Sequence, residues 1–303
     1  MSGARHEVRL PGARISYLEW TPSTAPERTL VLLHGAGMDC AQLAWGHLGA
    51  ALASAGHRVL APDLPGFGES AAATWVATQA NLVACVGEFV DEVAPDGVTG
   101  GVTVGGTSMG GGLSLGYALA HPERVRSLVL AASAGIADRV VDGALSLPVQ
   151  VLTRLMIRSG RLDVAARWRR LDRQQLAKSL TAVLCRPGSV TDDVLDIVAR
   201  EVRLGHGRDA NRQWQLSEML WTRARTVYTG DLPRVATPVL ILHGSKDTGV
   251  PLAAAQRAAQ ALPQSTLVVA DGAGHWVTRD ATDVVLPAML GFLDSEAVRC
   301  PAR

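Results

Sequence analysis

Short apolar runs alternate with amphipathic stretches along the first part of the chain and again near its end. Apolar runs without polar alternation are typical of strands covered on both faces, as in a parallel sheet. The stretches between them carry helical spacing and stop at glycine or proline. Buried strands are predicted at residues 29–33, 58–61, 98–105, 127–132, 238–242 and 266–270. Helices are predicted at residues 42–55, 78–93, 110–120, 253–262 and 284–293.

The amino-terminal stretch follows a different period. Residues 7–10 and 14–20 alternate between polar and apolar side chains, and Pro11-Gly12 lies between them. This pattern predicts an antiparallel hairpin at the edge of the sheet. With the six buried strands it gives a doubly wound, mostly parallel eight-stranded sheet of the α/β class.

The alternation is interrupted between residues 136 and 235, where no strand is predicted. Helical spacing covers residues 145–157, 162–184, 190–202 and 210–227. We therefore expect a sheet core formed by residues 1–135 and 236–303. Residues 136–235 are expected to form a helical cap, or lid, over it.

The amino-acid composition limits the classes of protein to which this chain can belong. Hydrophobic residues make up 48% of the 303 residues and charged residues 19%, which predicts a sizeable buried core. The net charge is +1 with no basic block, so neither nucleic acid nor a membrane is expected as a partner. We expect a monomer or homodimer that acts on a small molecule.

The start of the chain, residues 1–10, has no apolar leader, and no apolar run approaches the ~20 residues of a membrane span. The cysteines are scattered without a C-x-x-C pair, which favours free thiols in a reducing cytoplasm. They are Cys40, Cys85, Cys185 and Cys300.

One pentapeptide carries the strongest chemical signal, Gly106-Thr107-Ser108-Met109-Gly110. It lies where a predicted strand gives way to a predicted helix. A serine at such a tight turn is held with its hydroxyl exposed at the edge of the sheet. The flanking glycines allow the close backbone approach that a larger side chain would block. Ser108 is therefore the candidate nucleophile.

A serine hydroxyl needs a base, and the base needs a group that orients it. Asp247 and His275 each follow a predicted strand, at the edge where open α/β sheets place their sites. The order Ser108, Asp247, His275 is that of an α/β-hydrolase sheet. Asp138, just past another strand, remains an alternative acid.

Several segments together resemble the α/β-hydrolase superfamily, in its cap-bearing branch of esterases and C–C hydrolases. They are His34-Gly35-Ala36-Gly37, residues 62–70 from Pro62 to Ser70, the Ser108 turn with Gly111, residues 121–125, Gly244-Ser245-Lys246-Asp247 and Gly274-His275-Trp276. The resemblance implies an oxyanion hole formed by the backbone N–H groups of Ala36 and Met109. Gly35 and Gly37 would let that loop approach a substrate carbonyl. His34, Asp63 and Ser70 are expected to brace the loop.

The nucleophile and its oxyanion hole favour acyl transfer to water, so hydrolysis of a carboxylic ester is the first expectation. Hydrolysis of a carbon–carbon bond in a vinylogous diketone remains open, although Thr107 stands where such relatives typically carry asparagine. Cyclase, lyase or non-catalytic binding roles on this scaffold also remain open.

Metal and nucleotide motifs are absent from the sequence, so no cofactor and no metal are expected. The substrate is expected to be small and largely apolar, because large apolar side chains of the insert are suited to lining its pocket. The candidate pocket residues are Met156, Trp214, Trp221 and, beside the base, Trp276.

Overall fold

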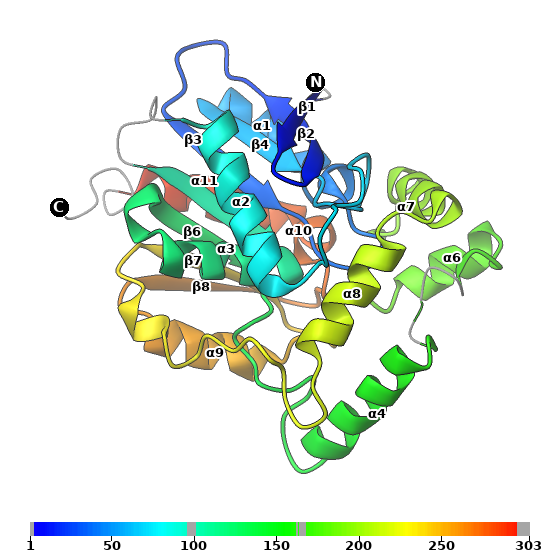
Figure 1. The fold of residues 1–303 in the computed structure, drawn as a ribbon. Helices are drawn as coiled ribbons and strands as arrows, with labels where there is room; N and C mark the ends of the chain where they lie inside the picture. Colours follow the sequence, from blue (N-terminus) through cyan, green and yellow to red (C-terminus); the bar gives the residue numbers. More distant parts are fainter. Residues whose placement is uncertain (1–2, 96–100, 162, 164–167, 296–303) are drawn as a thin grey trace.

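The computed structural model describes residues 3–95, 101–161, 163 and 168–295. Its strands are β1 (Ala4–Leu10), β2 (Ala13–Trp20), β3 (Arg28–Leu33), β4 (His57–Pro62), β5 (Val102–Thr107), β6 (Val125–Ala131), β7 (Val239–Gly244) and β8 (Ser265–Ala270). They form one eight-stranded sheet in the order β1-β2-β4-β3-β5-β6-β7-β8 (Figure 1). The pairs β1–β2 and β2–β4 are antiparallel, and all other neighbours are parallel. The predicted sheet is confirmed.

Two apolar layers cover the two faces of this sheet. Its flanking helices are α1 (Ala41–Ser54), α2 (Gln79–Val93), α3 (Met109–Ala120), α9 (Leu252–Ala261), α10 (Val277–Asp280) and α11 (Thr282–Asp294). Apolar residues of α2, α3 and α9, such as Phe89, fill one layer. Residues of α1 and α11, such as Trp45, fill the other. The central strands β3, β5 and β7 are buried at every position because helices cover them on both sides.

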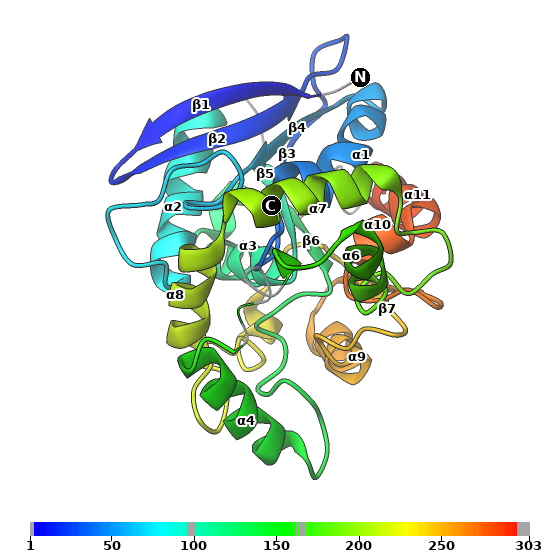
Figure 2. The ribbon, with the colours of Figure 1, turned by 90° about the vertical axis from the view of Figure 1, so that its right-hand side faces the viewer.

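Among the described residues, four further α-helices lie between β6 and β7, and both ribbon views show them at one end of the sheet (Figures 1 and 2). They are α4 (Ser146–Arg158), α6 (Arg173–Leu180), α7 (Asp192–Leu204) and α8 (Arg208–Glu218). A third apolar cluster joins α6 and α7 to Met38, Cys40 and Leu43, which follow β3. The helices therefore pack over the carboxyl ends of the parallel strands.

Local capping explains where two of these helices begin. Asp172 accepts a hydrogen bond from the backbone of Gln175, whose side chain accepts one in return, so a complete capping box opens α6. Thr191 caps α7 with one bond only, since its hydroxyl oxygen accepts the N–H of Val194 at 3.3 Å. Gly205, with φ of 74°, ends α7 in the left-handed conformation that glycine adopts without strain.

Two predicted helices were too long. The helix predicted at 210–227 ends at Glu218, because the chain turns back there: Met219 bridges Ala224, and the N–H of Arg225 donates to the carbonyl of Glu218 at 2.7 Å. Of the helix predicted at 162–184, residue 162 and residues 164–167 lie outside the described residues.

The described part of that second helix, α6, ends at Leu180. Its continuation is held by the core instead, since the carbonyl of Val183 accepts the N–H of Trp276 at 3.1 Å. Tertiary contacts outweighed local helix preference in both places. Residues 98–100 of the predicted fifth strand lie outside the described residues.

The cysteines Cys40, Cys85 and Cys185 are free, and Cys300 lies outside the described residues. Within the ranges that the structure describes, no helix has the length and apolar character needed to cross a membrane.

Candidate active site

Ser108 stands at a strained turn between β5 and α3. Its φ is 49° and its ψ is −114°, a conformation that is uncommon for a residue other than glycine. The N–H of Ser108 donates to Ala131 and its carbonyl accepts from Ala134, both at 2.9 Å, so neighbouring backbone fixes the strained turn.

The glycines of the motif are required by this packing. A Cβ atom on Gly106 would lie 2.2 Å from the backbone of Gly110, and one on Gly110 would lie 2.5 Å from the carbonyl oxygens of Leu33 and His34. A side chain at either position would force β5, α3 and β3 apart. The two glycines are therefore needed because β5, α3 and β3 approach one another closely at this turn.

The hydroxyl of Ser108 faces an imidazole from a distant part of the chain. Nε2 of His275 lies 3.0 Å from Oγ of Ser108. Nδ1 of His275 lies 2.9 and 3.0 Å from the two carboxylate oxygens of Asp247. His275 is carried by the loop between β8 and α10, and Asp247 by the loop after β7. The three side chains thus have the contacts that a nucleophile, its base and an orienting acid require.

Asp247 is fully buried but well supplied with donors. The N–H groups of Gly249 and Val250 donate to its Oδ1 at 2.7 and 3.0 Å. Burial opposes ionisation of this carboxyl, but the hydrogen bond and charge of His275 and the backbone donor of Val250 outweigh it. The pKa of Asp247 is consequently lowered, and the carboxylate stays ionised.

The alternative acid lies elsewhere. Asp138 is exposed on the segment after β6, and its backbone carbonyl accepts the N–H of Ala224 at 2.7 Å. In the described structure the acidic partner of His275 is Asp247.

The two expected oxyanion donors lie on either side of Ser108. Met109 begins α3, and the first N–H groups of a helix have no partner within it. Ala36 lies in the loop after β3 and lines the same cavity as Ser108. An oxyanion hole formed by these two N–H groups stays a prediction.

A buried carboxylate that we did not anticipate holds this loop. Asp39 accepts the N–H of Gly35 at 2.6 Å and that of Cys40 at 2.9 Å, and the hydroxyl of Thr107 lies 3.3 Å away. Burial raises the pKa of Asp39, while His34 and the backbone donors oppose the rise. Its place directly before a predicted helix was the available signal, since aspartate there often binds nearby N–H groups.

The residues expected to brace the loop make such contacts. The nitrogens of His34 contact the carbonyl of Gly35 at 2.7 Å and the N–H of Leu64 at 2.9 Å. Asp63 accepts the N–H of Ala41 at 2.8 Å, and Ser70 donates to the carbonyl of Asp63 at 2.6 Å. The loop that carries Ala36 is therefore connected to its neighbour by buried hydrogen bonds.

Two adjoining cavities meet near the nucleophile. The inner cavity, about 280 Å³, is lined by Ser108, His275 and Trp214. The outer cavity, about 520 Å³, is lined by Gly37 and Trp276. They share part of their lining, namely Ala36, Ile157 and Gln215. The linings of these two cavities do not include three of the candidates, Gly35, Met156 and Trp221.

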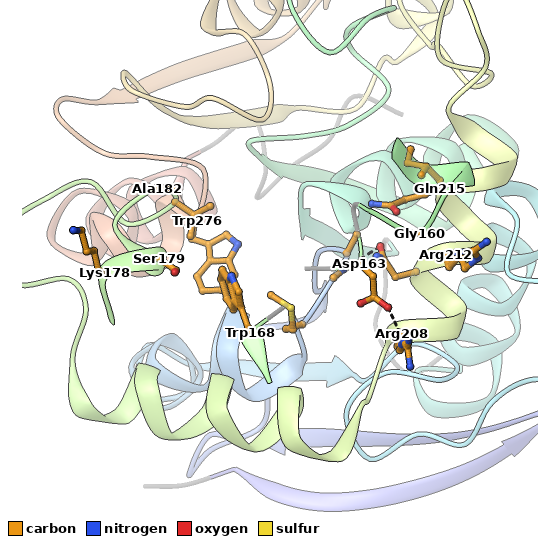
Figure 3. Close-up of a pocket in the computed structure, with 16 residues that line it drawn as sticks. Gly160, Asp163, Trp168, Lys178, Ser179, Ala182, Arg208, Arg212, Gln215 and Trp276 are labelled. Atoms are coloured by element: carbon orange, nitrogen blue, oxygen red, sulfur yellow. Dashed lines mark hydrogen bonds and ion pairs between the residues drawn. The ribbon is translucent and has the colours of Figure 1, made fainter. Parts of the chain in front are cut away.

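The outer cavity carries an excess of positive charge (Figure 3). Lys178, Arg208 and Arg212 line it, together with one carboxylate, Asp163. Nε of Arg208 lies 2.5 Å from Oδ2 of Asp163, and Arg212 donates to a backbone carbonyl at 3.4 Å. In this view the indoles of Trp168 and Trp276 lie between Lys178 and the two arginines. This arrangement suits a planar group with an anionic end.

The part of the chain that the structure describes contains no group of three or more histidine, cysteine or acidic residues that could hold a metal ion.

Similarity to known proteins agrees with the fold. The acetyltransferase component of the acetoin cleaving system of Pseudomonas putida is 33% identical to this chain over 266 residues. The match covers 87% of this chain and 63% of the acetyltransferase component, so this chain spans less than two thirds of the length of that protein. A 2-hydroxy-6-oxo-6-(2'-aminophenyl)hexa-2,4-dienoic acid hydrolase of Metapseudomonas resinovorans is 26% identical over 295 residues, 96% of this chain and 91% of that protein.

A solved structure of a serine hydrolase involved in carbazole degradation superimposes with a TM-score of 0.75 at 22% identity, covering 96% of this chain and 99% of that one. The family model described as alpha/beta hydrolase fold matches residues 28–281. This chain belongs to the alpha/beta hydrolase fold family.

Proposed function

We propose that this chain is a serine hydrolase that cleaves a carbon–carbon bond next to a ketone in an unsaturated 2-hydroxy-6-oxo acid. One observation carries the proposal: a cavity lined by Ser108 and His275 opens to a second cavity lined by three cations. A neutral ester needs no such cationic surroundings, whereas the acid end of an oxo-dienoic acid does. The relative from Metapseudomonas resinovorans is named for an acid of this class.

In the proposed reaction, the substrate first moves its 2-hydroxyl proton to the chain carbon next to the ketone, which becomes tetrahedral and is then attached to an enone. Oγ of Ser108 attacks the ketone carbon while His275 takes the hydroxyl proton of the serine. The bond between the ketone carbon and the tetrahedral chain carbon breaks. The acyl group remains on Ser108, and the electron pair passes through the enone to its oxygen, which takes a proton. Water then cleaves the acyl–enzyme with His275 as base.

The departing electron pair explains why the acid end must be held. A carbon leaving group is poor unless its electron pair is delocalised, and the conjugated chain of the acid provides that delocalisation. Holding the carboxylate near Arg212 would keep the conjugated chain extended toward Ser108. The N–H groups of Ala36 and Met109 would stabilise the oxygen of the attacked carbonyl.

Ester hydrolysis, which the sequence favoured, remains the second candidate. The observation in its favour is Thr107, which stands where carbon–carbon hydrolases typically carry asparagine and which contacts Asp39 at 3.3 Å. The same Ser108 chemistry would cleave an ester, with oxygen in place of carbon as the leaving atom.

Turnover of two substrates separates these candidates. We expect kcat/KM for 2-hydroxy-6-oxo-6-(2'-aminophenyl)hexa-2,4-dienoic acid to exceed kcat/KM for p-nitrophenyl butyrate. Cleavage of the acid is measured by the loss of its dienol absorbance. Efficient cleavage of the ester with no cleavage of the acid would contradict the first candidate and support the second.

We also propose that residues 136–235 form a lid that selects the substrate. Thr153 and Ile157 of α4 and Trp214 of α8 line the cavity that contains Ser108, which supports this role. Truncation of Trp214 should change the order of preferred substrates more than the rate on a small ester. The cytoplasmic location and the monomeric or dimeric state stay predictions.

A further inference from the structure

Helix α4 buries two polar residues, Ser146 and Gln150, together with Ile157, and leaves several leucines exposed to solvent. Ser146 and Gln150 are 8% and 0% exposed. Leu145, Leu152 and Leu155 are 68%, 57% and 50% exposed. A helix on the surface of a globular protein normally has the opposite arrangement. Some other apolar surface is therefore required to cover these leucines.

Internal hydrogen bonds fix α4 in this orientation. The side-chain amide of Gln150 donates to the carbonyl of Leu220 at 2.9 Å and accepts the N–H of Val140 at 3.4 Å. Rotating the helix to bury its leucines would break both bonds and expose the cavity that Ile157 lines. The inverted face is thus built into the fold.

The exposed side chains form one patch, which we call the α4 patch. Leu145, Leu152 and Leu155 follow helical spacing along one side of α4, and Leu147 and Trp221 extend the patch, with exposures of 42% and 44%. Both ribbon views place α4 at the end of the molecule farthest from β1 (Figures 1 and 2). A stable contact between two proteins buries about 800 Å² on each partner, and a protruding helix offers few neighbouring elements to extend the patch.

Positive charge surrounds this patch. Residues 143–161 and 219–230 contain five arginines and no acidic residue. These arginines are Arg154, Arg158, Arg161, Arg223 and Arg225. The guanidinium groups of Arg154 and Arg158 lie 5.9 and 5.8 Å from the ring centre of Trp221.

Several acidic residues lie near these two segments along the chain. Glu218, three residues before Trp221, is 5% exposed and accepts the N–H of Thr226 at 3.1 Å. Asp142 lies 3.2 Å from Arg257, so that its charge is already paired. Asp138 is exposed. Repulsion between the arginines opposes the meeting of two copies through this patch, and the same charges favour an anionic surface.

We propose that the α4 patch binds the surface of a bilayer that contains anionic lipid. The leucines would enter the boundary of the acyl chains, Trp221 would lie at headgroup level, and the arginines would contact phosphate groups. Thr153 and Ile157 of the same helix line the cavity that contains Ser108. When the protein is bound, this side of the cavity would therefore lie next to the membrane. The proposal does not depend on the bond that Ser108 cleaves.

The experiment is vesicle flotation of the full chain. Vesicles of phosphatidylcholine alone are compared with vesicles that also contain phosphatidylglycerol. We expect the wild type to float with the anionic vesicles only, and added salt to release it. A Leu152→Ser/Leu155→Ser double variant should bind at least ~10-fold more weakly, because two apolar side chains no longer leave water. Leu204→Ser, which changes a leucine on α7 that is 52% exposed, is the matched control and should bind like the wild type.

Unchanged binding by the double variant, or no binding of the wild type to anionic vesicles, would overturn the proposal. A wild-type dimer that the double variant dissociates, without vesicle binding, would instead assign the patch to a second copy. The altered leucines line neither cavity, so turnover of p-nitrophenyl acetate should be equal in all three proteins and would show that the variants are folded.

Discussion

The backbone N–H of Gly37 donates to the side-chain carbonyl oxygen of Asn211 at 3.1 Å, across 174 positions of sequence. Gly37 belongs to the loop that carries the expected oxyanion donor Ala36, and Asn211 stands on α8. The N-cap residue of the same helix binds the loop after β4, since the N–H of Gly207 donates to the carbonyl of Gly66 at 2.7 Å. One helix of the insert therefore fixes the loop beside Ser108.

Asn211→Ala should lower kcat on p-nitrophenyl acetate, a substrate too small to depend on the outer cavity. Leaving one N–H of the loop without its acceptor costs about 1–3 kcal/mol, which corresponds to roughly 5- to 100-fold in rate. Asn211→Asp keeps an acceptor and should retain most of the rate. An equal loss in both variants, or a change in KM alone, would contradict a role in positioning the loop.

Asp247→Asn should lower kcat/KM by up to ~10⁴-fold while the protein stays folded, because the amide no longer orients the imidazole of His275. Asp138→Asn is the matched control and should retain the wild-type rate. Steady-state kinetics with circular dichroism as a folding check would measure both. A near-normal rate for Asp247→Asn together with a large loss for Asp138→Asn would identify Asp138 as the acid.

The pH profile should show one protonation on its acid side. The pKa of Asp247 is lowered below the ordinary aspartate value of about 3.9, so this group stays ionised at pH values above it. Asp247 therefore adds no protonation to the activity profile above that value, and a base that is already protonated cannot accept the proton of Ser108. We expect log kcat/KM to rise with unit slope and then level off. A slope of two, or a rate that falls as the pH rises through this limb, would contradict the assignment.

Arg212→Gln should raise KM for the oxo-dienoic acid by about 10-fold or more, since a hydrogen bond to a charged group contributes about 1.5–3 kcal/mol. The methyl ester of the same acid carries no charge there, and its KM should change little. Arg203→Gln, an exposed arginine on α7 that lines neither cavity, serves as control. Equal effects on acid and methyl ester would place the carboxylate away from Arg212.

The periodicity of the sequence predicted the sheet and its flanking helices. This was possible because the apolar residues within each strand or helix show which part of that element is buried. The prediction that Ser108, Asp247 and His275 share a site used their positions after strands, and the structure brings the three side chains together. Their catalytic roles stay predictions until they are measured.

Features that arise from contacts between distant segments could not be read from the sequence. Trp221 resembled a pocket residue because it is large and apolar, yet it is exposed beneath two arginines. Asp39 resembled an ordinary loop residue, although it is buried and holds the loop before α1. The arginines around the α4 patch come from two segments that only the fold unites, so a net charge of +1 concealed them.

The most direct test of the account is the mass of the enzyme after mixing with 2-hydroxy-6-oxo-6-(2'-aminophenyl)hexa-2,4-dienoic acid and rapid quenching in acid. We predict a 2-aminobenzoyl adduct on the peptide that contains Ser108, no adduct in Ser108→Ala, and no turnover by that folded variant. Cleavage of the acid by Ser108→Ala at the wild-type rate, or an adduct on another residue that persists in this variant, would contradict the central claim that Ser108 is the nucleophile.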